Sequence, residues 1–228
     1  MAAHYVITGA NRGIGLGFVK SYLATGAKVT AIVRSSDSEG ELKQVAAESE
    51  QLRVLAGDLS DNSAIKKLAE QIEQPIDCLI NNAGAYGGKG QRLGAIDSQV
   101  WLDTFTVNTL APYFLTEALL PKLASHARVA FVSSKMGSIA DNGSGGAYIY
   151  RSAKAALNAA VKSLSIDLLE RGIYTVTLHP GWVKTRMGGP NALISIEESV
   201  SGMTKVIAGL NADTTGRFVN VDGAEIPW

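Results

Sequence analysis

Short apolar runs alternate along the chain with stretches whose apolar residues recur every three or four positions. The short runs are typical of buried strands, and the three-to-four spacing is typical of helices with one buried face. Strands are predicted at 4–8, 29–33, 53–56, 77–81, 128–133, 173–178 and 217–221. Helices are predicted through Ile14, Phe18 and Tyr22 and then at 41–50, 62–73, 100–123, 147–171 and 196–210.

This regular alternation indicates a parallel sheet with helices on both faces. The expected fold class is α/β, a Rossmann-type doubly wound parallel sheet of about seven strands. No linker, composition break or internal repeat interrupts the series, so residues 1–228 are expected to form a single domain. The irregular stretches 84–94, 134–146 and 185–195 each follow a strand, and ligands bind at the carboxyl ends of strands in such sheets.

Composition narrows the function classes. The 228 residues carry 21 basic and 21 acidic side chains, so the chain lacks the positive charge expected of a protein that binds nucleic acid or an anionic membrane. No apolar run reaches the length of a membrane span, and no signal peptide is expected. Cys78 cannot form an internal disulfide and lies in an apolar run, which predicts a buried thiol and a cytoplasmic location. The three histidines are scattered, so no metal site is expected.

A glycine-rich turn lies between the first predicted strand and the first predicted helix. Gly9, Gly13 and Gly15 are spaced G-x-x-x-G-x-G, which differs from the common dinucleotide fingerprint G-x-G-x-x-G. A backbone without Cβ atoms can approach a pyrophosphate, and the helix start supplies unpaired N–H groups. The context therefore predicts a dinucleotide site.

Two arginines indicate which dinucleotide is bound. An acidic residue that holds the ribose 2′-hydroxyl is expected at the end of the second strand, where this chain has Val33 and Arg34. Arg12 lies just before Gly13. Guanidinium groups suit a 2′-phosphate, so NADP(H) is predicted rather than NAD(H).

Tyr150 and Lys154 are candidates for proton-transfer chemistry, because a spacing of four residues places both on one helical face. An unperturbed tyrosine has a pKa near ~10. An ammonium group about 4 Å away would favour the phenolate by roughly 4 kcal/mol at an effective dielectric constant of about 20. The pair thus predicts a Tyr150 pKa lowered to near ~7, suitable for an acid–base catalyst.

Several motifs occur together in a fixed order along nearly the whole chain, and they resemble the short-chain dehydrogenase/reductase family. They are Thr8 to Gly15, Asp58-Leu59, Asn81 to Gly84, Asn108, Ser133-Ser134, Tyr150 with Lys154, and Pro180-Gly181. Finer stretches at 134–139, 179–185, 187–192 and 225–228 are similar to the C-factor and sniffer-type carbonyl reductase branch.

The resemblance implies catalytic roles for four residues. Tyr150 would protonate the carbonyl oxygen as hydride arrives from the nicotinamide. Lys154 would hold the nicotinamide ribose and lower the pKa of Tyr150. Ser134 would donate a hydrogen bond to the substrate oxygen, and Asn108 would bend its helix and hold a proton-relaying water.

The resemblance also implies the walls of the cofactor and substrate sites. The expected cofactor contacts, besides Tyr150 and Lys154, are Gly9, Asn11, Arg12, Gly13, Ile14, Arg34, Asp58, Leu59, Asn82, Ala83, Gly84, Pro180, Gly181, Val183 and Thr185. Tyr148, Trp182 and Met187 are candidates for the substrate pocket, although Trp182 and Met187 could equally cover the cofactor.

One spacing departs from the family pattern. The family serine usually lies about 13 residues before the tyrosine, whereas Ser134 lies 16 before Tyr150 and Ser138 lies 12 before it. Ser134 is preferred because it directly follows the apolar strand, and the intervening glycine-rich loop must then bulge outward.

The expected function is the NADPH-dependent reduction of a small, partly apolar ketone or aldehyde, or oxidation of the corresponding alcohol. The alternative is a cofactor-binding signalling or regulatory protein of the C-factor type. Relatives pair through the two long helices, here 100–123 and 147–171, which makes a homodimer or homotetramer an expectation that a bulged 135–147 loop would oppose.

Overall fold

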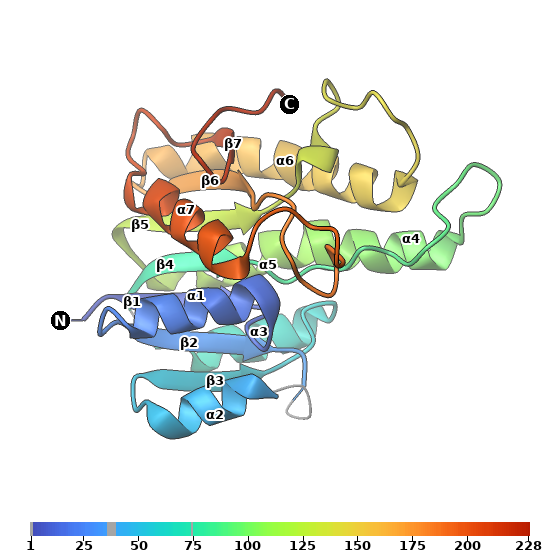
Figure 1. The fold of residues 1–228 in the computed structure, drawn as a ribbon. Coiled ribbons are helices and arrows are strands. Elements are labelled where there is room, and N and C mark those ends of the chain that lie inside the picture. The colour runs from blue at the N-terminus through green and yellow to red at the C-terminus, as the bar shows by residue number, and fades with distance from the viewer. Residues whose placement is uncertain (1, 36–39, 74) are drawn as a thin grey trace.

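The computed structural model describes residues 2–35, 40–73 and 75–228, and it contains one parallel sheet of seven strands in the order β3-β2-β1-β4-β5-β6-β7 (Figure 1). The strands are β1 His4–Thr8, β2 Lys28–Val33, β3 Leu52–Ala56, β4 Ile76–Asn81, β5 Leu123–Val132, β6 Tyr174–His179 and β7 Arg217–Asn220. All six neighbouring pairs are parallel. The predicted doubly wound α/β class is confirmed.

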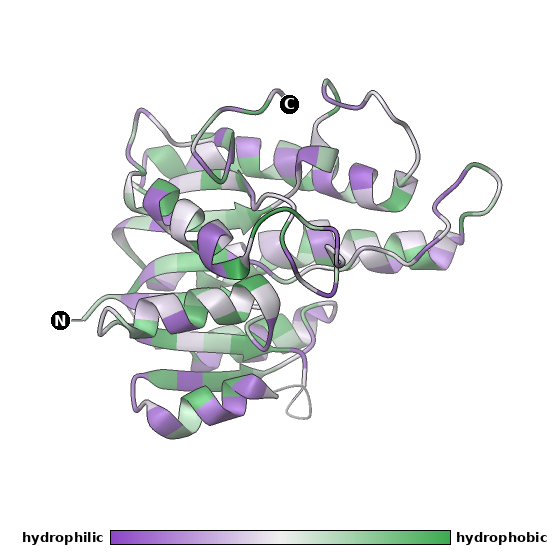
Figure 2. Ribbon diagram, in the orientation of Figure 1, coloured by the Kyte–Doolittle hydropathy of each residue, from purple (hydrophilic) through white to green (hydrophobic). Residues whose placement is uncertain are grey.

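Helices cover both faces of this sheet and separate two apolar cores. The helices are α1 Gly13–Leu23, α2 Glu41–Glu48, α3 Asn62–Gln71, α4 Ser98–Phe105, α5 Ala111–Leu119, α6 Tyr148–Leu169 and α7 Ile196–Ala208. One core packs α1, α2 and α7 against the sheet, with Phe18 and Met203 fully buried. The other packs α3, α5 and α6 against the opposite face, with Phe131 and Val161 fully buried. Figure 2 shows mostly hydrophobic strands between helices of mixed character.

The helix predicted at 100–123 differs from the structure in two ways. Its path from α4 to α5 passes through a π-helical segment at Thr106–Leu110, and it ends in a 3-10 turn at Leu120–Lys122. Strand β5 then begins at Leu123, five residues earlier than predicted, because Leu123 pairs with Ile76 before a register shift. A π segment adds a residue to one turn and commonly marks a functional position.

The carboxyl ends of the strands meet at one edge, where the long loops gather (Figure 1). Chain order reverses between β1 and β4, which are adjacent although β2 and β3 intervene in sequence. Such a switch point is the usual binding crevice of this architecture. None of the helices in the described ranges is both long and apolar enough to cross a bilayer.

Candidate active site

The glycine turn after β1 is tied to the end of β4 by four hydrogen bonds. The Thr8 hydroxyl accepts from the backbone N–H groups of Asn82 and Ala83, both at 2.9 Å. The Asn82 side-chain amide donates to the carbonyl oxygens of Thr8 at 2.9 Å and Gly9 at 3.3 Å. These bonds hold two predicted cofactor segments side by side across the switch point.

Glycine is required at two positions of this turn for different reasons. Gly9 has a φ of +63°, and a Cβ there would lie 2.9 Å from the Ala83 Cα. A Cβ on Gly15 would lie 2.2 Å from the Gly9 carbonyl oxygen. The turn therefore keeps its shape only without these side chains.

The start of α1 presents the backbone that a pyrophosphate requires. Arg12 occupies the N-cap without a side-chain capping bond, and the first turn holds no acidic residue. Gly13 has a φ of +55°, and a Cβ there would lie 3.5 Å from Thr185 in the loop after β6. Asn11 and Ile14 are half-buried in the same turn. The N–H groups at the start of α1 therefore lie between the glycine turn after β1 and the loop after β6, a position that suits an anionic group.

Four of the predicted cofactor contacts follow neighbouring strands. Arg12 and Arg34 are exposed. They follow β1 and β2, which pair directly, with Thr8 opposite Ile32. Asp58 and the half-buried Leu59 follow β3, the next strand. The Asp58 carboxylate accepts from the backbone and hydroxyl of Ser60, at 2.9 and 2.8 Å, which fixes the start of this turn.

Helix α6 carries Tyr150 and Lys154 on its buried face, packed by Leu157, Val161 and Leu168. The Lys154 Nζ donates to the Val132 carbonyl oxygen at 2.8 Å and lies 5.9 Å from the centre of the Tyr150 ring. Tyr150 is 8% exposed and Lys154 4%. The structure therefore brings the predicted pair together.

The predicted lowering of the Tyr150 pKa is wrong for this structure. Burial raises the pKa of the phenol to about 12, and the nearby Ser134 side chain opposes this rise only in part. Burial also lowers the pKa of Lys154 to about 8. The reason is that both groups lose water, while the ammonium directs its hydrogen bond to Val132 rather than to the phenol.

Ser134 and Ser138 have separate partners. The Ser134 side chain lies close enough to the Tyr150 phenol to lower its pKa, and the Ser134 hydroxyl accepts from the backbone of Met136 at 3.2 Å. The Ser138 hydroxyl instead donates to the Pro227 carbonyl oxygen at 2.5 Å. Of the two candidates, only Ser134 lies against the tyrosine. The loop between them and α6 bulges outward through exposed residues 139–145, as expected.

Asn108 is buried in the π-helical segment and holds the loop after β4. Its Oδ1 accepts from the Ala85 backbone at 2.8 Å, and its Nδ2 donates to the Ala85 carbonyl oxygen at 2.7 Å. A Cβ on Gly84 would lie 2.9 Å from Asn108 Oδ1 and 3.7 Å from Lys154 Nζ. Asn108, Gly84 and Lys154 therefore surround one small space.

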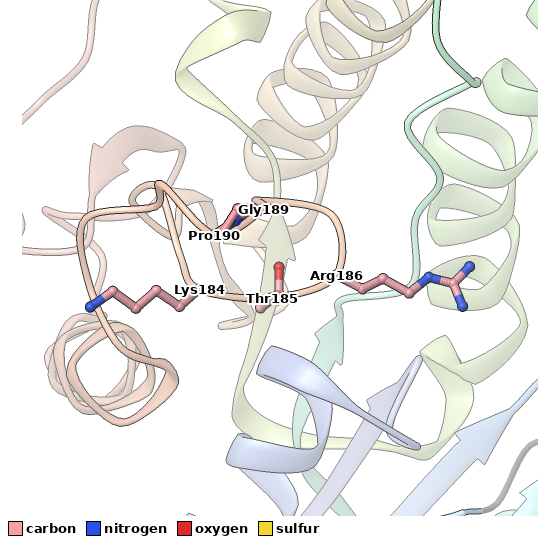
Figure 3. Close-up of a pocket in the computed structure, with 5 residues that line it drawn as sticks. All are labelled: Lys184, Thr185, Arg186, Gly189 and Pro190. Atoms are coloured by element: carbon pink, nitrogen blue, oxygen red, sulfur yellow. The ribbon is translucent and has the colours of Figure 1, made fainter.

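The loop after β6 forms another wall, with Pro180, Gly181 and the buried Val183 leading to Thr185. The Thr185 hydroxyl accepts from the Gly188 backbone at 3.1 Å, and the Trp182 indole donates to the Gly188 carbonyl oxygen at 2.7 Å. A cavity of about 540 Å³ is lined by Lys184, Thr185, Arg186, Gly189 and Pro190. Figure 3 shows Lys184 and Arg186 leaving the loop in opposite directions. Sequence reasoning assigned no role to either cation.

The apolar candidates for the substrate pocket are partly exposed. Trp182 and Met187 lie on the β6–α7 loop, and Tyr148 is the first residue of α6. Tyr86 was missed: its ring centre lies 4.9 Å from that of Tyr150, and 39% of the residue is exposed. Gln91 was also missed, although its side chain accepts from the Tyr150 backbone. Nothing in a glycine-rich, aperiodic loop distinguishes these two residues in sequence.

Comparison with known proteins agrees with this geometry. Residues 3–192 match the family described as short chain dehydrogenase. The chain is 53% identical over 156 residues to C-signal of Myxococcus xanthus, an alignment that covers 68% of this chain and 93% of C-signal.

Two solved structures are similar over essentially their whole lengths. The carbonyl reductase Sniffer of D. melanogaster is 37% identical with a TM-score of 0.93, and both chains are fully covered. An NADPH-bound carbonyl reductase from chicken fatty liver is 34% identical with a TM-score of 0.93, covering 100% of this chain and 99% of that chain. The chain therefore belongs to the short chain dehydrogenase family of oxidoreductases, in the branch that holds C-signal and the Sniffer-type carbonyl reductases.

Proposed function

We propose that this protein is an NADPH-dependent reductase of small, partly apolar ketones or aldehydes, which also oxidises the corresponding alcohols. The observation that carries the proposal is the placement of the Ser134 hydroxyl beside the buried Tyr150 phenol, with the buried Lys154 ammonium 5.9 Å from the centre of the phenol ring. Two hydroxyl donors at one point suit a carbonyl oxygen on which negative charge develops.

The residues present fit NADP(H). Open backbone at Gly13 and the uncapped start of α1 would hold the pyrophosphate, and Arg12 and Arg34 would face the 2′-phosphate. Thr185 would contact the nicotinamide end from the opposite loop. The similar chicken enzyme binds NADPH, which supports this assignment. When bound, the reduced cofactor supplies the hydride.

Side chains of this chain would supply the proton and stabilise the charge that its transfer leaves behind. Because the pKa of Tyr150 is raised to about 12, its phenol stays protonated at neutral pH and can donate its proton to the carbonyl oxygen. Ser134 would donate a second hydrogen bond to that oxygen. The charged Lys154 nearby would then stabilise the phenolate that remains on Tyr150.

The substrate class follows from the walls of the site. Four aromatic and apolar side chains are partly exposed: Tyr86 lies against the Tyr150 ring, Tyr148 begins α6, and Trp182 and Met187 lie on the β6–α7 loop. These side chains would bind the carbon groups on either side of a carbonyl, while the two hydroxyls fix its oxygen.

The test is NADPH oxidation with a panel of aliphatic and aromatic aldehydes and ketones. The parent protein is expected to turn over at least one class, and Tyr150→Phe is expected to lose about a hundredfold or more in kcat. Tyr174→Phe is the matched control, because Tyr174 lies at the amino-terminal end of β6, whereas the proposed site lies at the carboxyl ends of the strands. A Tyr150→Phe protein that retained parental turnover would refute the assigned role.

A cofactor-binding regulatory protein is the second candidate, supported by the similarity to C-signal. Such a protein needs no proton donor, so it gains nothing from burying Lys154 at a cost in stability. If the parent binds NADPH but oxidises none with any member of the panel, the regulatory function is favoured.

A further inference from the structure

Gln91 is an unusual residue of the loop between β4 and α4. Its neighbours Arg92, Leu93 and Gly94 are exposed, whereas Gln91 is only 7% exposed. A buried amide must place its donors and acceptor on polar partners, because leaving one unpaired costs about 1–3 kcal/mol. Gln91 has partners for both ends of its side chain, and these partners lie at the proposed active site.

The acceptor end of Gln91 caps the helix that carries the proposed catalytic tyrosine. Helix α6 begins at Tyr148, so the Tyr150 N–H belongs to the first turn and has no partner within the helix. Ala147 at the N-cap has a φ of +46° and offers no side-chain acceptor. Gln91 Oε1 accepts from the Tyr150 N–H at 3.0 Å, and the Gln91 carbonyl oxygen accepts from the Ala147 N–H at 3.1 Å.

The donor end of Gln91 holds the aromatic wall of the same site. Its Nε2 donates to the Tyr86 carbonyl oxygen at 2.7 Å and to the Gly88 carbonyl oxygen at 3.2 Å. The Tyr86 ring in turn lies against the Tyr150 ring. A Cβ on Gly87 would lie 2.6 Å from Ile149, so the loop is packed closely on the first turn of α6.

We propose that Gln91 is a positioning residue for the reductase reaction: it caps α6 at Tyr150 and fixes the phenol against Ser134 and the Tyr86 wall. This inference rests on the proposed function. The first turn of a helix frays when its N–H groups lack partners, and fraying here would displace the reacting hydroxyl. A displacement of about 1 Å at a reacting group can cost roughly a hundredfold in rate.

Two substitutions separate the cap on α6 from the bonds that Gln91 donates to Tyr86 and Gly88. Gln91→Met keeps the length of the side chain but removes both the acceptor and the donor. Gln91→Glu keeps an acceptor for the Tyr150 N–H, and its negative charge suits a helix start, but it cannot donate to Tyr86 or Gly88 when ionised. Gln99→Met is the matched control, since Gln99 is exposed on α4.

The measurements are kcat with a carbonyl substrate, the Kd of NADPH, and hydrogen exchange of the backbone amides at 148–151. In Gln91→Met, kcat is expected to fall about ten- to a hundredfold while the Kd of NADPH stays within about twofold. Exchange at 148–151 is expected to accelerate in Gln91→Met. Gln91→Glu is expected to restore slow exchange at 148–151, because it keeps the acceptor for the Tyr150 N–H, and to restore kcat only in part, because the bonds to Tyr86 and Gly88 are lost. Gln99→Met is expected to match the parent.

Several results would overturn the inference: parental kcat in Gln91→Met, a loss of kcat matched by an equal loss of NADPH binding, or a Gln91→Glu protein whose amides at 148–151 exchange as fast as in Gln91→Met. Unchanged exchange at 148–151 would overturn it without reference to activity. A parent protein that reduces no carbonyl would refute the proposed function instead, and the exchange measurement would still decide whether Gln91 caps the helix.

Discussion

Burial shifts the pKa values of Tyr150 and Lys154 in opposite directions, and at neutral pH both groups still carry their protons. The phenol is neutral when protonated and the ammonium is charged, so loss of water stabilises the proton on Tyr150 and destabilises it on Lys154. At neutral pH the result is a protonated phenol beside an ammonium that is close to its own titration range.

The pH dependence of reduction should therefore report Lys154. Its pKa of about 8 means that the charge is present at pH 7 and lost as the pH rises through 8. We expect kcat/KM for carbonyl reduction to fall about tenfold for each pH unit above this value. The measurement is kcat/KM at saturating NADPH from pH 6 to 10, and a flat profile across that range would show that Lys154 does not govern the proton transfer.

The same shift predicts a stability effect of Lys154→Met. The folded pKa lies below the unfolded value of about 10.5, so the folded state binds fewer protons, and the parent gains stability as the pH rises from about 8 to 10.5. The stability of the methionine variant relative to the parent should therefore decline over this window. Thermal unfolding of both proteins at pH 7, 8, 9 and 10 measures the difference, and a constant difference would contradict the buried ammonium.

At the scale of elements, the sequence predicted the helices and strands that are set by the local pattern of apolar residues. The period of apolar residues located all seven strands, and it placed α6 within two residues at each end. The π segment at Thr106–Leu110 has a distant cause, because Asn108 binds the Ala85 backbone, 23 residues away. The cap on α6 likewise depends on a bond from Gln91, 59 residues before Tyr150. Local patterns carry no signal of such pairings.

Helix α3 offers a test of capping from a distance. Lys122 Nζ donates to the carbonyl oxygens of Ala69 at 2.5 Å, Glu70 at 3.2 Å and Ile72 at 2.5 Å, all at the C-terminal end of α3. An ammonium there pairs carbonyls that the helix leaves unbonded and opposes the negative end of its dipole.

We expect Lys122→Met to lower the free energy of unfolding by about 1–3 kcal/mol. For a chain of this size that corresponds to a decrease in Tm of roughly 2–4 °C per kcal/mol. Lys66→Met is the control, because Lys66 is exposed on α3. Equal Tm values for the two variants would show that the three carbonyl contacts contribute nothing measurable.

At the scale of the whole molecule, the parallel sheet explains why the location of the site could be predicted from sequence, although its detailed geometry could not. Parallel strands bring every strand-to-helix loop to one edge, so motifs that are far apart in sequence, such as Gly13 and Thr185, become neighbours. The charge state of the site could not be predicted in the same way. It depends on how completely α6 is covered and on where the Lys154 ammonium points, and the four-residue spacing determines neither.

The buried His4 links β1 to its two neighbouring strands, and His4 and His179 should both lower the stability of the fold in acid. His4 in β1 meets the Thr30 hydroxyl of β2 at 2.8 Å and the Pro75 carbonyl oxygen at 3.2 Å, and its backbone N–H donates to Asp77 at 2.7 Å. Burial lowers the pKa of His4. Burial also lowers the pKa of His179, at the end of β6, to about 4.

Both folded pKa values lie below the unfolded value of about 6.5, so the unfolded state binds more protons and stability must fall as the pH drops below about 6.5. For His179 alone the loss by pH 4 is on the order of 3 kcal/mol. Urea unfolding of the parent and of His179→Asn at pH 7.5, 6, 5 and 4 measures this slope. The variant should lose less stability than the parent between pH 6.5 and 4, whereas parallel curves would mean that His179 accepts a proton without disturbing the end of β6.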